Sequence, residues 1–422
     1  MTERMIFLKK ILRCVLIVAA AALAGLLLMT AVYLIPTGRI RANAVSSVKV
    51  FEAEGDYPKL IPMHFNTTLD NWTDATILAE AAYDGEKSLM QRVCLVPHIE
   101  YGSDTQANSF IRVFTGESGA KPEDVNYGRY WHGYLLLIKP LMLLTDYSGI
   151  RELMGFAQLV MFCMAEYLVL KKHRKDIAAA LLFLYAFLNP AAVSMTLNYG
   201  VIFFILFGEL LYILCHEERY ADRSVWLYHF VTVGCMTAFF DYLTYPLVTF
   251  GVAMLMLLAL YPSSVKADFF ATVKTGIGWI FGYVGMWASK WVLGSLISGE
   301  NILAEAGRTL AMRSAGDVGE DFSRVGLMLA AIYKNLTASK LVLGLTGLFF
   351  IAGIVYMLRR KEKPDFGRLI LMFAYMAAPL LWYAMAANHS YIHYFFTYRT
   401  LSISVFGASM LGMNFFFEKP EG

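Results

Sequence analysis

Charged residues are scarce in this sequence. Only 16% of its 422 residues are Asp, Glu, Lys or Arg, 58% are hydrophobic, and the mean hydropathy is +0.53. A soluble globular domain carries about 25% charged residues. The shortage of charge argues against a soluble protein and indicates a chain that is embedded in a membrane.

Cysteine is scarce as well, and its positions exclude further classes. Of the five cysteines, only Cys94 lies in a long polar region, and the others lie in or beside apolar runs. A lone cysteine there forms no internal disulfide, so a disulfide framework is excluded. The sequence also lacks CxxC, Cys/His metal spacings, a P-loop and a strand-associated GxGxxG. These absences argue against a cysteine-ligated metal protein and an ATP-driven pump.

Long apolar runs are what the sequence has in abundance. Runs of about 20 apolar residues cross a bilayer as helices, and their continuity excludes a barrel of short alternating strands. We predict an all-α integral membrane protein, with residues 1–422 as one polytopic domain of about ten transmembrane helices. The first run is long enough to span, which favours an uncleaved helix over a signal peptide. The predicted spans are 15–34, 153–170, 177–193, 201–215, 226–240, 248–260, 277–297, 341–358, 369–385 and 394–417.

Basic clusters orient these helices. Four basic residues precede the first run, and KKHRK and RRKEK follow two later runs. Because basic residues favour the inner side, both termini are predicted to be cytoplasmic, in a cell membrane that we expect to be bacterial. Two long segments, 37–149 and 298–340, then lie outside. We expect an amphipathic surface helix over 130–147, because a span there would place KKHRK outside.

Two aspartates in the first outer segment are candidate general bases. Asp70 and Asp74 stand four residues apart in LDNWTDA. If a helix begins near Trp72, Asp70 caps it and Asp74 lies in its first turn, where the helix dipole favours an anion. That is the structural alternative. The functional alternative is a catalytic base at the mouth of a membrane cavity, with Asp70 as the first choice and Asp74 as the second.

Aromatic rings and polar groups gather at two further membrane edges. The stretch NYGRYWHGY contains Arg129, Tyr130 and His132, and FFDYLTYP contains Asp241 and Tyr245. Aromatic residues there are typical interface anchors, and a buried acid often belongs to an ion pair. The same groups would also suit a sugar, because aromatic faces cover a pyranose while Arg129 binds hydroxyl groups or a phosphate.

Cations and histidines stand beside other apolar runs. Lys290 lies inside a run, where a central lysine costs about 2.5–3.5 kcal/mol, so it either snorkels to the interface or binds an anion. His389 and His393 have the spacing of helical zinc sites, but Ser390 occupies the glutamate position of HExxH, and we predict no metal. Arg399 follows in the same stretch and is expected to pair with a carboxylate or a phosphate.

Together these groups fit one substrate, a sugar linked to a lipid phosphate. The cations suit the phosphate, the aromatic rings suit the sugar, and an acid would deprotonate the acceptor hydroxyl. No cofactor is needed besides this co-substrate. The partners that we expect are the lipid bilayer, the polyprenyl-phosphate-linked sugar and a glycan or lipid-linked acceptor, with no nucleic acid.

The order of the segments resembles that of a known superfamily. A first span, a large acidic outer loop, a surface helix and then a helical bundle are similar to the GT-C superfamily of glycosyltransferases, which use polyprenyl-phosphate sugars. The resemblance implies transfer to a cell-envelope acceptor on the outer face. It extends to Asp70 and Asp74 by loop position, and to Lys290 and Arg399 by role only. In many members the acid follows the first span closely, whereas Asp70 lies well beyond it.

A transporter or flippase of a lipid-linked or polar envelope precursor is the alternative function. It would also use buried cations, but it predicts broken helices at the membrane midplane, often in two matching halves. The polar groups of this chain lie mainly at the predicted outer face, and no halves match, which favours the enzyme. A non-enzymatic partner in polymer assembly or export is the third hypothesis.

Overall fold

The protein is almost entirely helical, which confirms the predicted all-α class. The computed structural model describes residues 3–102, 104–116, 121–315, 318, 322–359 and 365–416. Within these residues the only strands are β1 (His98–Glu100) and β2 (Glu123–Val125), which pair in antiparallel fashion. Parts of the second basic cluster and of segment 298–340, and the C-terminal tail, lie outside the described residues.

Ten helices occupy the positions of the ten predicted spans. Six are long and apolar enough to cross a membrane: α1 (Glu3–Tyr33), α7 (Tyr147–Lys171), α10 (Leu197–Cys215), α14 (Val265–Ser298), α17 (Lys340–Arg359) and α18 (Phe366–Met385). Four are shorter, with 13 to 15 residues: α8 (Lys175–Leu188), α12 (Trp226–Phe240), α13 (Val248–Leu260) and α21 (Ser402–Phe416). At 1.5 Å per residue each of these four helices is about 20 Å long, which is less than the hydrocarbon thickness of about 30 Å.

Two predicted boundaries are wrong. The helix predicted over 277–297 begins earlier, at Val265, because Ser264 caps a helix that no proline interrupts. The last long helix begins at Ser402 and not at Tyr394. The preceding residues form the short α20 (Tyr394–Thr397) and the 3₁₀ turn η2 (Tyr398–Leu401).

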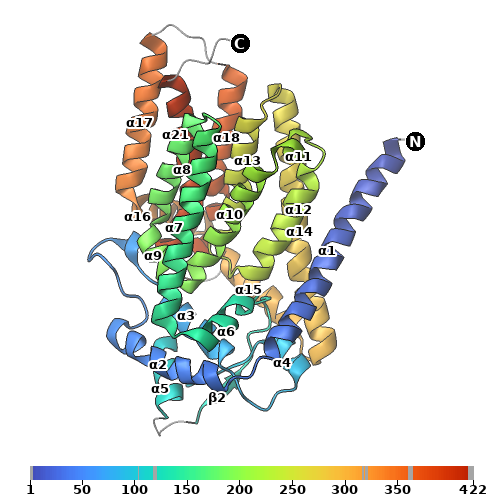
Figure 1. Ribbon diagram of the computed structural model, residues 1–422, viewed down its shortest axis with the longest axis vertical. Coiled ribbons are helices and arrows are strands. Elements are labelled where there is room, and N and C mark those ends of the chain that lie inside the picture. The colour runs from blue at the N-terminus through green and yellow to red at the C-terminus, as the bar shows by residue number, and fades with distance from the viewer. Residues whose placement is uncertain are drawn as a thin grey trace.

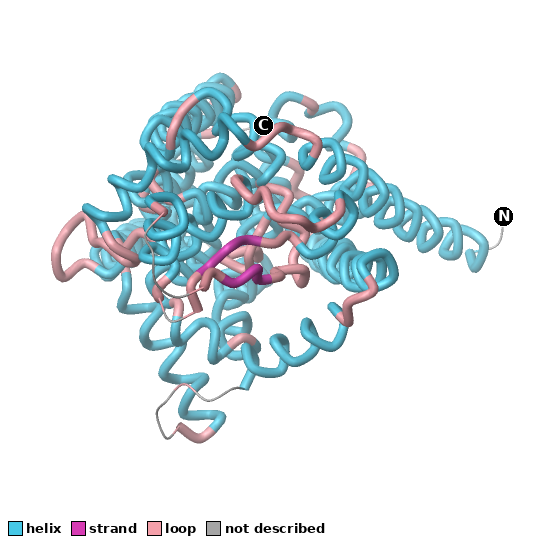
Figure 2. Tube along the Cα trace, turned by 90° about the horizontal axis from the view of Figure 1, so that it is seen from below, coloured by secondary structure: helices cyan, strands magenta, loops and turns pink. Residues whose placement is uncertain are grey.

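The segment 37–149 folds over one end of the bundle, and α1 begins and α21 ends at the opposite end (Figure 1). Figure 2, which views the molecule from below, shows the two strands near the centre of the covered end. The segment contains α2 (Gly38–Glu54), η1 (Phe65–Thr67), α3 (Asn71–Ala81), α4 (Leu89–Leu95), α5 (Gln106–Thr115) and α6 (Leu135–Leu144).

The predicted surface helix over 130–147 is shorter in the structure, where α6 begins at Leu135. His132 has a positive φ of 58°, a conformation that cannot continue a right-handed helix. Segment 298–340 contributes α15 (Ile302–Ala315) and α16 (Arg324–Ala338), and the remaining short helices are α9 (Pro190–Ser194), α11 (Glu217–Ala221) and α19 (Ala387–Ile392).

A shared apolar core joins the covering segment to the bundle. Phe51 of α2 stacks on Tyr147 of α7 with 5.2 Å between ring centroids, and Trp131 packs against Phe239 of α12 at 5.6 Å. These four residues belong to one continuous cluster of buried side chains. The covering segment is therefore held rigidly over the bundle, and polar groups of both can line one site.

Candidate functional site

Asp70 caps α3, as its position in the sequence predicts. Its carboxylate accepts hydrogen bonds from the Thr73 backbone N–H at 3.1 Å, the Thr73 hydroxyl at 2.8 Å and the Asn198 amide at 3.0 Å. The residue is only 2% exposed. Burial raises the pKa of this carboxyl, against the opposing effect of the hydrogen bonds. Asp70 is therefore a better proton acceptor than an exposed aspartate.

Asp74 lies in the first turn of α3, also as predicted, but it contacts a different set of groups. Its carboxylate accepts hydrogen bonds from the backbone N–H groups of Leu197 at 2.8 Å and Asn198 at 3.1 Å, and from the Tyr147 hydroxyl. Leu197 and Asn198 begin α10, where N–H groups lack partners within the helix. Burial raises the pKa of Asp74 to about 7, although the Tyr147 hydroxyl counteracts it. Asp74 thus fastens α3 to α10.

A cavity of about 300 Å³ opens beside the first turn of α3. It is lined by four of the predicted site residues, Asp70, Arg129, His389 and His393. The other lining residues come from segment 37–149, from α10, α15 and α20, and from the turn after α12: Tyr57, Trp72, Thr73, Thr76, His98, Glu100, Gln106, Val125, Asn126, Tyr127, Asn198, Tyr242, Arg313 and Phe396. The cavity combines carboxylates, guanidinium groups, imidazoles and aromatic rings.

Two arginines form a cationic wall of the cavity. Arg129 donates a hydrogen bond to Glu305 at 2.7 Å, and its guanidinium lies 4.2 Å from the Tyr127 ring centroid. Arg313 of α15 donates to Nδ1 of His389. The Nε atoms of both arginines are buried without a hydrogen-bond partner in the described part of the chain. The wall therefore carries two guanidinium groups, of which that of Arg129 forms an ion pair with Glu305.

The two histidines of this wall are neutral for structural reasons. Nε2 of His389 donates to the Leu243 carbonyl at 2.8 Å, which leaves Nδ1 as the acceptor for Arg313. The His393 ring stacks on Phe396 at 5.2 Å, and its nitrogens have no hydrogen-bond partner among the described residues. Burial and the nearby Arg313 lower the pKa of His393 to about 3. Both rings can therefore bond to a ligand without carrying charge.

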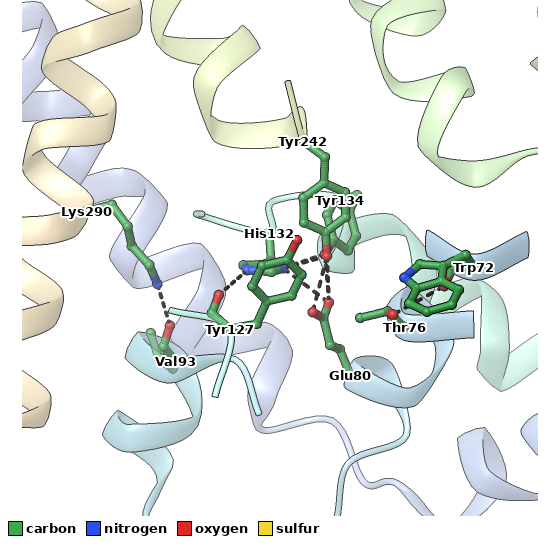
Figure 3. Close-up of polar contacts among 9 residues, drawn as sticks. All are labelled: Trp72, Thr76, Glu80, Val93, Tyr127, His132, Tyr134, Tyr242 and Lys290. Atoms are coloured by element: carbon green, nitrogen blue, oxygen red, sulfur yellow. Dashed lines mark hydrogen bonds and ion pairs between the residues drawn. The ribbon is translucent and has the colours of Figure 1, made fainter. Parts of the chain in front are cut away.

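A buried carboxylate behind the cavity was not predicted from the sequence. Glu80, on the last turn of α3, accepts hydrogen bonds from the hydroxyls of Tyr134 at 2.7 Å and Tyr242 at 3.2 Å (Figure 3). Nδ1 of His132 lies 3.2 Å from the same carboxylate, and Nε2 of His132 donates to the Tyr127 carbonyl at 2.6 Å. Tyr127 and Tyr242 both line the cavity. The buried cluster thus fixes two aromatic rings of the cavity wall.

Lys290 and Arg399 do not belong to the residues that line the cavity. Lys290 donates to the Val93 carbonyl at 3.2 Å near the end of α4, and Arg399 donates to the Leu188 carbonyl at 2.8 Å at the end of α8. Carbonyl groups at helix C-termini lack intrahelical partners and favour a cation. Both side chains satisfy such carbonyls, so their positions do not favour the predicted contact with a lipid phosphate.

The remaining predicted residues stand close to the cavity but outside its lining. Tyr130 borders a smaller pocket of about 30 Å³, which Arg129 and Arg313 also line. Asp241 accepts a hydrogen bond from the Thr244 backbone N–H at 3.1 Å, and the Tyr245 hydroxyl donates to the Tyr199 carbonyl at 2.6 Å. Asp241 and Tyr245 therefore shape the turn that holds Tyr242.

The strand β1 adds polar groups that the sequence pattern did not reveal. Glu100 lies 3.1 Å from Nε2 of His98 and accepts a hydrogen bond from Gln106 at 2.6 Å. The hydrogen bond with His98 lowers the pKa of Glu100. A strand of three residues leaves no readable alternation. For Glu80, by contrast, the sequence did contain a signal. An acid inside the apolar run ATILAEAA is costly to bury without partners, so a buried partner could have been expected.

Comparisons of the chain with protein-family models, with curated proteins and with solved structures give no match. Its function has to be inferred from the geometry of this cavity.

Proposed function

We propose that the protein is a multi-pass membrane glycosyltransferase of the GT-C type. It would transfer a sugar from a polyprenyl-phosphate donor to a glycan or lipid-linked acceptor of the cell envelope, on the outer face. One observation carries the proposal: a buried aspartate, two arginines and several aromatic rings line the same cavity of about 300 Å³. This volume lies at the lower end of the range for small-molecule sites.

The membrane placement is supported by helix length and by charge. Six helices are long and apolar enough to span, and the four shorter ones pack among them. The segment 37–149, which supplies much of the cavity lining, lies at the end of the bundle away from the start of α1 (Figure 1). Because the basic clusters favour the cytoplasm, the cavity faces outward in this orientation, in a cell membrane that we take to be bacterial.

The proposed reaction gives each part of the wall a role. Asp70 accepts the proton of the acceptor hydroxyl while the oxygen of that hydroxyl bonds to the anomeric carbon of the sugar. The bond between that carbon and the phosphate oxygen breaks, and the polyprenyl phosphate leaves with the electron pair. Arg129 and Arg313 stabilise the negative charge that develops on it. The rings of Tyr127 and Tyr242 cover the sugar, and the scheme uses no metal.

The substitution Asp70→Asn tests the base. Asparagine caps helices about as well as aspartate, so α3 is retained while the proton acceptor is lost. We expect transfer from a polyprenyl-phosphate sugar in membranes to fall by about 10²–10⁴-fold, with a melting temperature lowered no more than that of Asp74→Asn, because both carboxylates accept three hydrogen bonds. The matched control is Asp74→Asn, which removes the same charge from the same turn of α3 outside the cavity.

Two results would decide against the proposal. Full transfer activity of Asp70→Asn would remove the proposed base. Movement of a labelled lipid-linked substrate across vesicles containing the wild-type protein, without any glycosidic product, would favour the transporter or flippase instead.

A further inference from the structure

Residues 59–65, with the sequence KLIPMHF, form an apolar loop that belongs neither to a predicted span nor to the cavity lining. Its apolar side chains point outward: Met63 is 88% exposed, Ile61 53%, Phe65 44% and Leu60 37%. Exposed apolar side chains gathered in this way mark an interaction surface.

The loop is held in one shape at its base. Lys59 and Thr68 form a β-bridge, and the Thr67 hydroxyl accepts from the Ile61 N–H at 3.1 Å and donates to the His64 carbonyl at 2.7 Å. Met63, at the tip, has a positive φ of 67°, which is uncommon for a residue with a side chain. Because the base is fixed by hydrogen bonds, the outward direction of the apolar tip is built into the fold.

The loop is attached to the ends of helices that we propose to span the membrane. The Asn66 carbonyl accepts hydrogen bonds from Asn189, which ends α8, at 2.8 Å and from the Tyr398 hydroxyl at 3.4 Å. The Asn66 side chain donates to the Ser339 hydroxyl, directly before α17, at 3.4 Å. In Figure 1 the blue loop protrudes beside α9 and α16. The tip therefore lies level with the outer ends of the bundle helices.

We propose that the tip of this loop inserts into the outer leaflet of the bilayer at headgroup depth. The lipid-facing surface continues onto α17, whose second residue, Leu341, is 75% exposed. Lys59 places its ammonium 4.4 Å from the Phe65 ring centroid. A cation beside an apolar tip suits the boundary between acyl chains and anionic headgroups.

Insertion of the loop fixes how far the cavity lies from the bilayer surface. Tyr57 precedes the loop, Asp70 follows it closely, and both line the cavity. The Tyr57 ring packs between Trp72 at 6.2 Å and Phe395 at 5.5 Å, so the loop and the cavity wall are one rigid unit. A lipid-borne phosphate would reach the cavity from the leaflet and not from water. The inference rests on the membrane placement within the proposed function, and not on the transfer chemistry.

Fluorescence quenching by brominated lipids tests the insertion. The full chain, with the exposed Cys163 and Cys215 replaced by alanine, is labelled with bimane at Met63→Cys and reconstituted into vesicles with lipids brominated on the acyl chain. We expect quenching that is weaker than at Leu348→Cys, on the exposed face in the middle of α17, and far above that at Glu86→Cys, an exposed position of segment 37–149.

The two controls separate the possible failures. Quenching at position 63 as weak as at position 86, with strong quenching at position 348, would overturn the insertion and leave the proposed function intact. Weak quenching at position 348 would remove the membrane placement, and with it both proposals. Dimerisation through the loop would instead appear as weak quenching at position 63 together with crosslinking of Met63→Cys between two copies, and this also overturns the insertion.

A substitution at Ile61 tests the insertion through transfer activity. Ile61→Asp should lower transfer from a polyprenyl-phosphate donor in bilayers by about tenfold or more. This fold-change corresponds to the free energy of burying one isoleucine side chain. Transfer from a short-chain, water-soluble donor should remain unchanged, because it does not approach through the leaflet. The control Ile61→Leu should behave as the wild type. Equal losses with both donors would show a role in folding and would contradict insertion.

Discussion

Charged side chains in the cavity wall differ from those behind it in what satisfies them. In the wall, Asp70 and Arg129 bond mainly to other side chains. Behind the wall, Asp74, Lys290 and Arg399 bond to backbone groups at helix ends. We interpret a buried charge that completes a helix end as part of the scaffold, and a charge that lines the cavity as available to a ligand. The predictions below test this distinction.

Besides the loss of Asp70, the largest effect is expected from Arg313→Gln. The variant removes a positive charge from the cavity wall, so that the leaving phosphate is less stabilised, and kcat should fall by about 10²–10³-fold. The control is Arg308→Gln, on the exposed face of the same helix and outside the cavity. If both variants lose activity equally, the effect comes from α15 as a whole and the wall has no special role.

The pH dependence of transfer should show one ionisation. Asp70 must be deprotonated to accept a proton, so kcat/KM should fall tenfold per pH unit below its pKa, which burial raises above the ordinary value of about 4. His393, with a pKa of about 3, stays neutral through this range and adds no second limb. A pH profile measured on the wild type and on His393→Gln checks this, and a limb that disappears in His393→Gln would assign the proton to the histidine.

Asp74→Asn should change stability and leave catalysis nearly intact. Because the pKa of Asp74 is raised to about 7, the folded state holds its proton more tightly than the unfolded chain. Its contribution to stability is therefore full at acidic pH and is lost as the pH rises through about 7. Asparagine has no such proton, so the melting temperature of the variant should depend less on pH than that of the wild type.

The variant should also be less stable by roughly 1–3 kcal/mol, because an amide offers a single acceptor oxygen to the three donors around position 74. Thermal unfolding followed at several pH values measures both effects. A large loss of transfer by a well-folded Asp74→Asn would show that Asp74 takes part in catalysis, and would contradict its assignment to the scaffold.

The smallest effect on activity is expected from Lys290→Met. The side chain donates to the Val93 carbonyl and lies 5.5 Å from the Trp131 ring, and methionine keeps most of that packing. We expect a loss of about 1 kcal/mol in stability and a change in transfer of less than about twofold. If transfer is abolished while the melting temperature is kept, Lys290 binds the substrate, as the sequence alone suggested.

Local features could be predicted from the sequence, and long-range ones could not. The cap at Asp70 and the place of Asp74 follow from residue spacing within one helical turn. The partner of Asp74 is the start of α10, 123 residues further on, and no spacing rule reaches that far. The contacts of Lys290 and Arg399 depend on where α4 and α8 end in space. Arg313 carried no signal, because an arginine in an amphipathic helix is ordinary.

The length of α14 connects the thickness of the membrane with the geometry of the cavity. Its 34 residues extend for about 50 Å, whereas the hydrocarbon layer measures about 30 Å. Helix tilts reach about 40°, which still leaves part of α14 outside the hydrocarbon. Near its C-terminal end, Trp291 donates a hydrogen bond to the Arg129 carbonyl at 2.8 Å. In the proposed orientation, a thinner or thicker bilayer that tilts this rod would act directly on the backbone of a cavity arginine.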